Sequence, residues 1–168
     1  GRTMSTHFSY QRKVLNNVYE SLTTFEEKED FVRKMGNYAE FYQNWIKYDG
    51  KDNSPFPKIG TSPDADLASM LILFLKSSNH KMAITILGSV YNLVIEQEPE
   101  SSETFICIVK AVAAYYFLWR SAFSNSGLDS TYREFFKKKE TISIDKIKTY
   151  LKDVLKNKEI DTLESWKC

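Results

Sequence analysis

The chain has 168 residues, of which 42% are hydrophobic, 14% aromatic and 27% charged, with a formal net charge of +1. A chain of this size buries about 70% of its unfolded surface, and its apolar content excludes general disorder. Its small net charge excludes steering of partners by overall charge. Two widely spaced cysteines and two histidines exclude a disulfide framework and an ordinary zinc site, and a reducing cytoplasm fits best.

Periodicity predicts two helices before residue 50. Apolar residues recur with helical spacing from about residue 9 to residue 22, which predicts the first. Thr24 followed by Glu27 forms a capping-box pattern, so a second helix is predicted from there to about Tyr48. Gly36 inside it weakens the helix by up to about 1 kcal/mol relative to Ala and indicates a bend or a close contact.

Two more helices are predicted after a loop over residues 49–61, which holds two Gly and two Pro. Pro63 at a first helical position opens the third helix, which ends near Lys76. The fourth covers about 80–97, and Gly88 within it predicts close approach of a neighbouring backbone. Because the turn between these helices is short, we expect them to pack as an antiparallel hairpin.

The helix at the centre of the fold is predicted over residues 105–123, a stretch whose only charges are Lys110 and Arg120. Apolar residues lie on almost every side of this helix, as expected for a helix surrounded by other helices. A membrane span of this length is the alternative, but Lys110 inside hydrocarbon would cost roughly 2.5 to 3.5 kcal/mol. We therefore expect a buried core helix over about 102–123 and no membrane partner.

The remaining segments predict a short helix over about 129–139 and a last long helix opened by Ser143 and Asp145. No alternation typical of strands and no repeat of 20 to 50 residues occurs. The fold class predicted is all-α, with six or seven helices packed around one central buried helix in a single domain over 1–168.

No pattern in the sequence indicates a catalytic centre. His80 is predicted at a helix start, as a surface residue or a partly buried hydrogen-bonder, and His7 lies near the beginning. The chain has no glycine-rich phosphate loop and no clustered metal ligands. We therefore predict no catalytic residue, no metal site and no cofactor.

Two features suit a binding surface. Eight lysines against three carboxylates make residues 137–158 basic, a pattern that could neutralise nucleic-acid phosphates or simply be the polar face of an amphipathic helix. The second feature is an aromatic row at helical spacing, which indicates core packing, with stacking on single-stranded bases as the alternative. The lysines are Lys137, Lys138, Lys139, Lys146, Lys148, Lys152, Lys156 and Lys158, and the aromatic row is Tyr38, Phe41, Tyr42, Trp45 and Tyr48.

The order of motifs near the end carries a family resemblance. An apolar helix ends in a Trp-Arg pair, a Gly-Leu-Asp turn leads to Tyr-Arg, and an Asp opens a final helix. This pattern resembles the helical region of GmrSD-type proteins, which are bacterial restriction proteins that depend on DNA modification. The matching positions are Trp119, Arg120, Gly127, Leu128, Asp129, Tyr132, Arg133 and Asp145.

The resemblance implies a longer parent protein, with a nucleotide-hydrolysing domain before the helical region and an HNH-like nuclease domain after it. Signatures of both domains are missing from this sequence, so no catalytic residue is carried over. The chain is then expected to be a fragment that positions the other domains of the parent chain or contacts DNA. Candidate structural or phosphate-contacting residues are Arg120, Arg133, Lys137, Lys138, Lys139, Lys148 and Lys152.

Arg120 has a further expected role at the end of the buried helix. A buried guanidinium needs a carboxylate or carbonyl partner, because an unpaired buried charge is costly. Asp129 or a helix C-terminal carbonyl is the expected partner, which would tie the central helix to the turn after it. Contact with phosphate is the alternative for Arg120 and Arg133.

Overall fold

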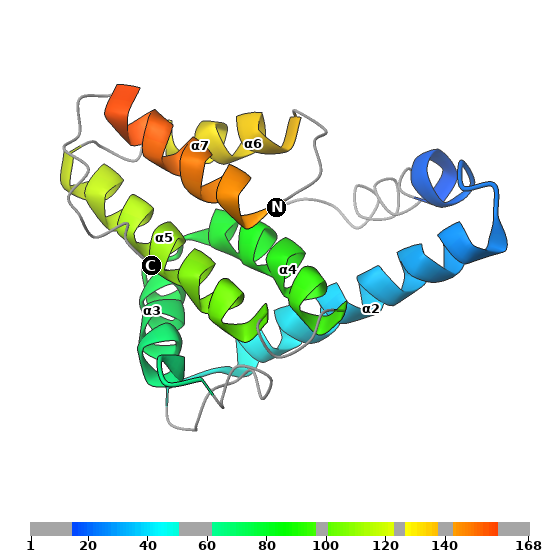
Figure 1. Ribbon diagram of the computed structural model, residues 1–168, viewed down its shortest axis with the longest axis horizontal. Helices are drawn as coiled ribbons and strands as arrows, with labels where there is room; N and C mark the ends of the chain where they lie inside the picture. The colour runs from blue at the N-terminus through cyan, green and yellow to red at the C-terminus, as the bar shows by residue number, and fades with distance from the viewer. Residues whose placement is uncertain (1–14, 51–61, 97–100, 123–126, 138–142, 158–168) are drawn as a thin grey trace, which may run out of the picture.

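The computed structural model describes residues 15–50, 62–96, 101–122, 127–137 and 143–157, and every regular element in these ranges is a helix. The all-α prediction is therefore confirmed. In chain order (Figure 1) the helices are the π-helix η1 (Leu15–Tyr19) and the α-helices α2 (Phe25–Lys47), α3 (Ala65–Ser77), α4 (Lys81–Glu96), α5 (Ser101–Ala122), α6 (Leu128–Lys137) and α7 (Ile144–Asn157).

The helix starts follow local capping chemistry. At α2 the predicted capping box is present: the Glu27 N–H donates to Thr24 Oγ1 at 3.1 Å, and the Thr24 N–H donates to Glu27 Oε2 at 3.0 Å. Helix α3 begins at Ala65, later than predicted, because the Ala65 N–H closes a turn onto the Ser62 carbonyl at 3.0 Å. The first predicted helix is described only from Leu15 and takes the form of η1.

Helix α5 packs against α3, α4 and α7. Ten of its described side chains are buried, whereas Phe117 is 60% exposed. Lys110 Nζ lies 2.6 Å from Asp64 Oδ2, so the charge in the middle of α5 is neutralised at the start of α3. By length and composition alone, Ser102–Ser121 of α5 could cross a bilayer, and 61% of that window is buried inside the fold. The fully buried side chains of α5 include Phe105, Ile108, Val109, Val112, Tyr115 and Trp119.

The helices on either side of α5 are arranged less simply than predicted. Helices α3 and α4 do not pack as a hairpin; they diverge, so that α3 packs mainly on α5 whereas α4 packs on both α2 and α5. The turn between them carries Asn79 at a φ of 55°, a left-handed conformation that redirects the chain. Helix α2 packs mainly on α4, and α6 packs on α7, so these two helices form outer layers around the core.

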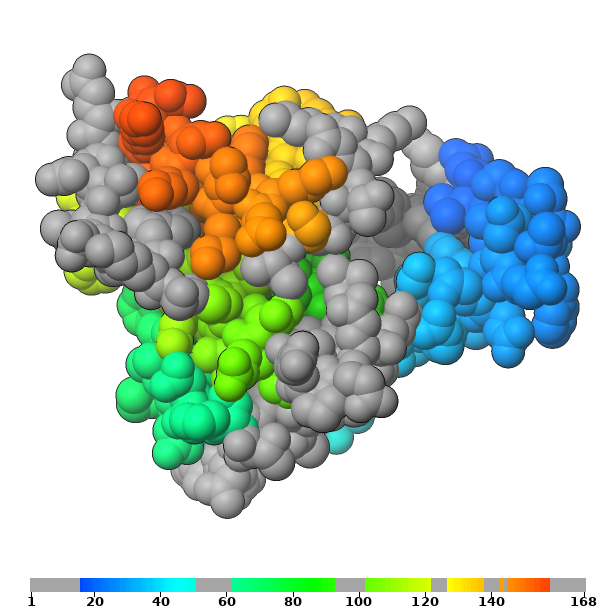
Figure 2. Space-filling view, viewed as in Figure 1, coloured from blue at the N-terminus to red at the C-terminus, as the bar shows by residue number. Residues whose placement is uncertain are grey.

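Only the C-terminal half of α2 belongs to the bundle. Its buried residues are Phe41 and Trp45, and the cap residue Tyr48 is buried beside them. The N-terminal half extends past the end of α4, accompanied by η1 (Figure 1), and forms a separate lobe in the space-filling view (Figure 2). Within this lobe, Tyr19 of η1 contacts Phe31 at 6.0 Å between ring centroids.

Candidate functional site

The motif that carries the family resemblance forms the junction between α5 and α6. Trp119 near the end of α5 is 1% exposed, and its indole lies beside Gly127, at the turn into α6. A Cβ at Gly127 would lie 3.3 Å from Trp119 Cζ2, and the φ of Gly127 is +87°. Leu128 and Tyr132 of α6 are buried next to this turn. A glycine therefore suits this turn for two reasons, its positive φ and its contact with the indole.

His80 completes the junction from the start of α4. It is 4% exposed, and its Nε2 forms a hydrogen bond of 2.9 Å with the Tyr132 hydroxyl. Its ring also lies against Tyr116 of α5, at 4.5 Å between centroids. Of the two roles predicted for His80, the hydrogen-bonder is the one observed, although the ring is fully rather than partly buried. The three helices α4, α5 and α6 thus meet at one buried imidazole.

Burial sets the protonation of this cluster. It lowers the pKa of His80 to about 4, despite the opposing attraction of the Asp129 carboxylate, so the imidazole is neutral near pH 7. Burial also raises the pKa of Tyr132 well above its usual value. A neutral imidazole joined to a neutral phenol is a structural pair, and neither group can supply a proton readily at neutral pH.

A polar pocket of about 350 Å³ opens on the surface above this junction. Lys81 and Arg120 supply positive charge there, Asp129 supplies a carboxylate, and His80 forms part of the wall. The other lining residues are Ser78, Asn79, Tyr116 and Leu128. The pocket brings together side chains from the start of α4, the end of α5 and the start of α6. Its charge balance suits an anionic group presented by a partner.

Arg120 and Arg133 are both exposed, contrary to the expectation of a buried arginine. No described residue forms a salt bridge or hydrogen bond with Arg120, and Asp129 does not pair with it although both line the pocket. The buried-charge argument fails because Arg120 lies on the exposed side of the last turn of α5, next to the buried Trp119, so that water solvates the guanidinium. The position of Arg120 leaves it available for an external partner.

The predicted lysine surface is mixed in charge. Lys137 Nζ lies 2.6 Å from Glu134 Oε1, Lys148 is half-buried, and Lys152 is exposed. Asp145 and Asp153 are exposed on α7 among the lysines. Predicted positions Lys138, Lys139 and Lys158 lie outside the described residues. On α7 the lysines occupy the polar side of an amphipathic helix whose other side buries Ile147, Leu151 and Leu155.

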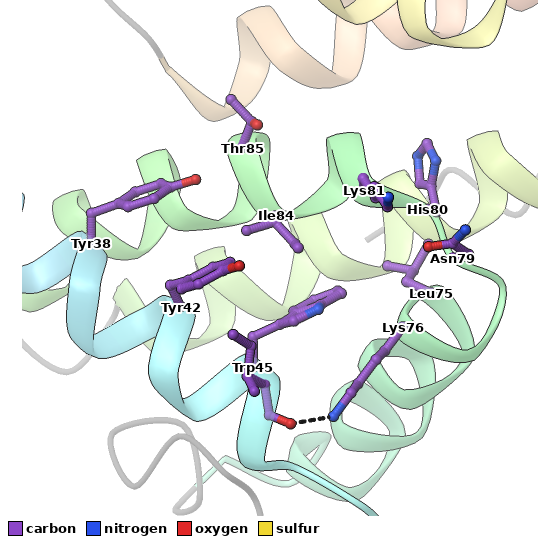
Figure 3. A pocket seen from close by; sticks show the side chains of 11 residues that line it. Tyr38, Tyr42, Trp45, Leu75, Lys76, Asn79, His80, Lys81, Ile84 and Thr85 are labelled. Atoms are coloured by element: carbon purple, nitrogen blue, oxygen red, sulfur yellow. Dashed lines mark hydrogen bonds between the residues drawn. The ribbon is translucent and has the colours of Figure 1, made fainter. Parts of the chain in front are cut away.

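The aromatic row divides between the core and a groove. Phe41, Trp45 and Tyr48 are buried, as core packing predicts, whereas Tyr42 is 45% exposed and Tyr38 is half-buried. Tyr38 and Tyr42 project from α2 toward α4, with Trp45 next to them, along one wall of a groove of about 540 Å³ (Figure 3). Asn79, His80 and Lys81 line both this groove and the polar pocket.

One contact in this groove could not be predicted from the sequence. Lys76 of α3 donates from Nζ to the Ile46 carbonyl at 2.7 Å (Figure 3) and also to the Tyr48 carbonyl. These carbonyls lie at the end of α2, where a cation is favoured by the helix dipole and by the unpaired acceptors. Lysines at a helix end are common on surfaces, so residue spacing alone does not reveal this contact.

Within the described part of the chain, no group of three or more His, Cys, Asp or Glu residues is arranged to hold a metal ion. Comparison of the chain with protein-family models, curated proteins and solved structures finds no match. The resemblance to GmrSD-type proteins therefore stays a prediction based on the residues around the α5–α6 junction.

Proposed function

We propose that this chain is a non-catalytic helical scaffold that positions other domains of a GmrSD-like, modification-dependent restriction protein. The strongest support is that some residues of the motif that carries the family resemblance are buried and others are exposed. Trp119, Leu128 and Tyr132 are buried and hold the junction together, whereas Arg120 and Arg133 are exposed. A purely structural motif would have no need of exposed arginines beside its turn, so these two are the candidates for contact with a partner.

The polar pocket is the part of this junction suited to that contact. Lys81, Arg120 and Asp129 project from three helices that meet at the buried His80, so packing at His80 fixes the backbone positions from which these charges extend. Exposed charges contribute little to folding, with a median of about 0 to 1 kcal/mol per exposed ion pair. Arginine pairs with carboxylates and phosphates through two parallel hydrogen bonds, which favours it for docking an acidic surface.

The experiment measures binding of this chain to the protein domains encoded next to it in its gene. Arg120→Gln and Arg133→Gln should each weaken that binding at least tenfold while the unfolding transition is unchanged. Lys34→Gln is the matched control, because Lys34 is an exposed cation on α2, remote in sequence from the pocket, that pairs with Asp30. Equal binding by Arg120→Gln and the control would refute the role of the pocket, and equal binding by Arg133→Gln would refute a role for that arginine, which does not line the pocket.

The scaffold proposal also makes a prediction for the purified chain alone. It should neither cleave modified or unmodified DNA nor hydrolyse nucleoside triphosphates, whereas the parent protein lacking this region should lose restriction. Robust cleavage that copurifies with the chain through successive columns, and that a single substitution in the chain abolishes, would overturn the non-catalytic assignment.

The alternative is a nucleic-acid-binding module, and the exposure of Arg133 and Lys152 on α6 and α7 favours it. Binding through phosphates weakens with salt, with a slope of about −0.9 per phosphate contacted on a logarithmic plot. A salt titration of duplex binding with the chain and with Lys148→Gln/Lys152→Gln separates the two functions. A slope near zero would exclude the alternative and leave the scaffold.

A further inference from the structure

A groove and a pocket meet at the turn between α3 and α4. The groove of about 540 Å³ lies beside α2 and α4 (Figure 3), and the polar pocket of about 350 Å³ lies above the α5–α6 junction. Asn79, His80 and Lys81 belong to the walls of both, so the two recesses adjoin at these residues. Each has the size of a ligand pocket, roughly 300 to 1,000 Å³. One ligand can therefore extend from the groove into the pocket.

Two contacts fix the ends of the groove. At one end α2 packs closely on Gly88 of α4, where the nearest atoms belong to the ring of Tyr38. At the other end Lys76 of α3 donates to two carbonyls at the end of α2. Tyr38 and Lys76 both line the groove, so its length is limited by these two contacts. A groove of limited length suits an inserted side chain better than a continuous strand.

The wall of the groove that α2 supplies is aromatic. Tyr42 and Trp45 lie next to each other on this wall, and Ile84 of α4 points toward them (Figure 3). Tyr42 is 45% exposed, so a ligand reaches its ring without any unfolding of the bundle. An aromatic side chain placed there gains both apolar burial and contact between rings. The groove therefore suits an aromatic anchor.

The charges around the two recesses are positive on balance. Lys76 is already occupied by the carbonyls of α2, whereas the side chains of Lys81 and Arg120 form no salt bridge or hydrogen bond with any described residue. Asp129 supplies the only carboxylate among the described residues that line the groove and the pocket. Two cations against one carboxylate match a ligand with a single carboxylate. A series of phosphates would bring further negative charge beside Asp129, which is unfavourable.

We propose that the groove and the pocket together bind an acidic segment of a partner protein. An aromatic side chain of the segment occupies the groove, and a neighbouring carboxylate pairs with Lys81 and Arg120. The guanidinium of Arg120 donates two parallel hydrogen bonds to that carboxylate, which fixes its orientation. This inference rests on the proposed docking role of the polar pocket and adds the chemistry of the segment that docks there.

Three small molecules test the two halves of the site in NMR titrations of the full chain. N-acetyltryptophan carries an indole and a carboxylate, N-acetyltryptophanamide has the same ring without the charge, and N-acetylglycine has the carboxylate without the ring. N-acetyltryptophan should bind with a Kd on the order of 1 mM and shift the signals of Lys81 and Ile84. It should bind about tenfold more tightly than its amide, because hydrogen bonds to charged groups are the stronger ones. Equal binding of the amide or of N-acetylglycine would overturn the proposal.

Substitutions separate the ring from the charge. Tyr42→Ala should weaken binding of N-acetyltryptophan about fivefold, and Arg120→Gln should make it bind no better than its amide. Phe25→Ala is the matched control, because Phe25 is 79% exposed at the other end of α2, and it should bind normally. Equal loss in all three variants would overturn the proposal. A short oligothymidylate that displaces N-acetyltryptophan would assign the site to a nucleic-acid strand and overturn it as well.

Binding of the neighbouring protein domains distinguishes this inference from the scaffold function. Both Arg120→Gln and Tyr42→Ala should weaken that binding. If only Arg120→Gln weakens it, the scaffold function stands and the aromatic groove has no part in docking, which overturns the inference. If N-acetyltryptophan binds as expected but neither substitution affects binding of the domains, the site is retained and the scaffold function is refuted.

Discussion

Replacing Gly88 of α4 with Ala probes the contact that holds α2 to the bundle. An ideal Cβ at Gly88 would lie 2.8 Å from Tyr38 Cδ2 and 3.1 Å from Phe41 Cδ1, both on α2. The neighbour is thus a pair of aromatic rings, not the backbone that the sequence analysis predicted. Gly36 of α2 is the matched control, because a Cβ there has no neighbour within 4 Å. Among the described residues, Gly36 therefore makes no close contact.

Both substitutions gain the higher helix propensity of Ala, but only one of them adds a steric cost. Ala in place of Gly inside a helix stabilises it by about 0.8 to 1 kcal/mol at either site. Only Gly88→Ala adds a steric term, which for overpacked cores is about 1 to 3 kcal/mol. Gly36→Ala should therefore raise the free energy of unfolding by up to about 1 kcal/mol, and Gly88→Ala should lie about 1 to 3 kcal/mol below it.

Urea unfolding at one low protein concentration, where association does not contribute, measures this difference. A third and a fourth variant, Tyr38→Leu with and without Gly88→Ala, complete a double-mutant cycle that should assign most of the steric cost to the Tyr38 ring. If Gly88→Ala proves as stable as Gly36→Ala, α2 does not pack against Gly88 as described, and the arrangement of α2 on α4 would be refuted.

Three further predictions concern the junction and the core. The pKa of His80 is about 4 when folded and about 6.5 when unfolded, so the unfolded chain binds the extra proton, and stability should fall as pH drops from 6.5 toward 4, by up to about 3 kcal/mol. His80→Gln keeps a hydrogen-bonding group but should flatten that part of a stability–pH curve; an unchanged curve would contradict the burial of the ring. Gly127→Ala should cost about 1 to 2 kcal/mol in thermal unfolding, because its φ is positive and Trp119 is adjacent; no loss would contradict that turn. Asp64→Asn should cost at most about 1 kcal/mol, since its pair with Lys110 is partly exposed, and a larger loss in urea unfolding would show a buried pair.

Much of the fold follows from local sequence patterns. The capping box of Thr24 and Glu27, the apolar stretch around residue 109 and the Gly127 turn each depend on neighbours within a few residues, so spacing reveals them. The α3–α4 hairpin was predicted wrongly because loop length does not specify the direction of the following helix. The φ of Asn79 decides that direction, and Asn is tolerated in left-handed and right-handed turns alike.

The candidate site was only partly predictable. The sequence motif indicated Arg120 and Arg133, but their exposure depends on which sides of α5 and α6 face the core, which tertiary packing decides. The hydrogen bond between His80 and Tyr132 joins residues 52 positions apart, and no local spacing encodes such a contact. The mixture of lysines with Asp145 and Asp153 is visible in the sequence, whereas the side of α7 on which these residues lie depends on which side of the helix is buried.

Only the C-terminal half of α2 packs on the bundle, so the backbone hydrogen bonds in the two halves of this helix should have different lifetimes. Around Phe41 and Trp45, amide protons should exchange with solvent only when the bundle opens. Before residue 37, the helix has the capping box and the local pairs of Asp30 with Arg33 and Lys34, so exchange there should be faster by orders of magnitude. A molecule that binds to this part of α2 should slow amide exchange selectively in the first three turns, so exchange there reports whether the surface is occupied.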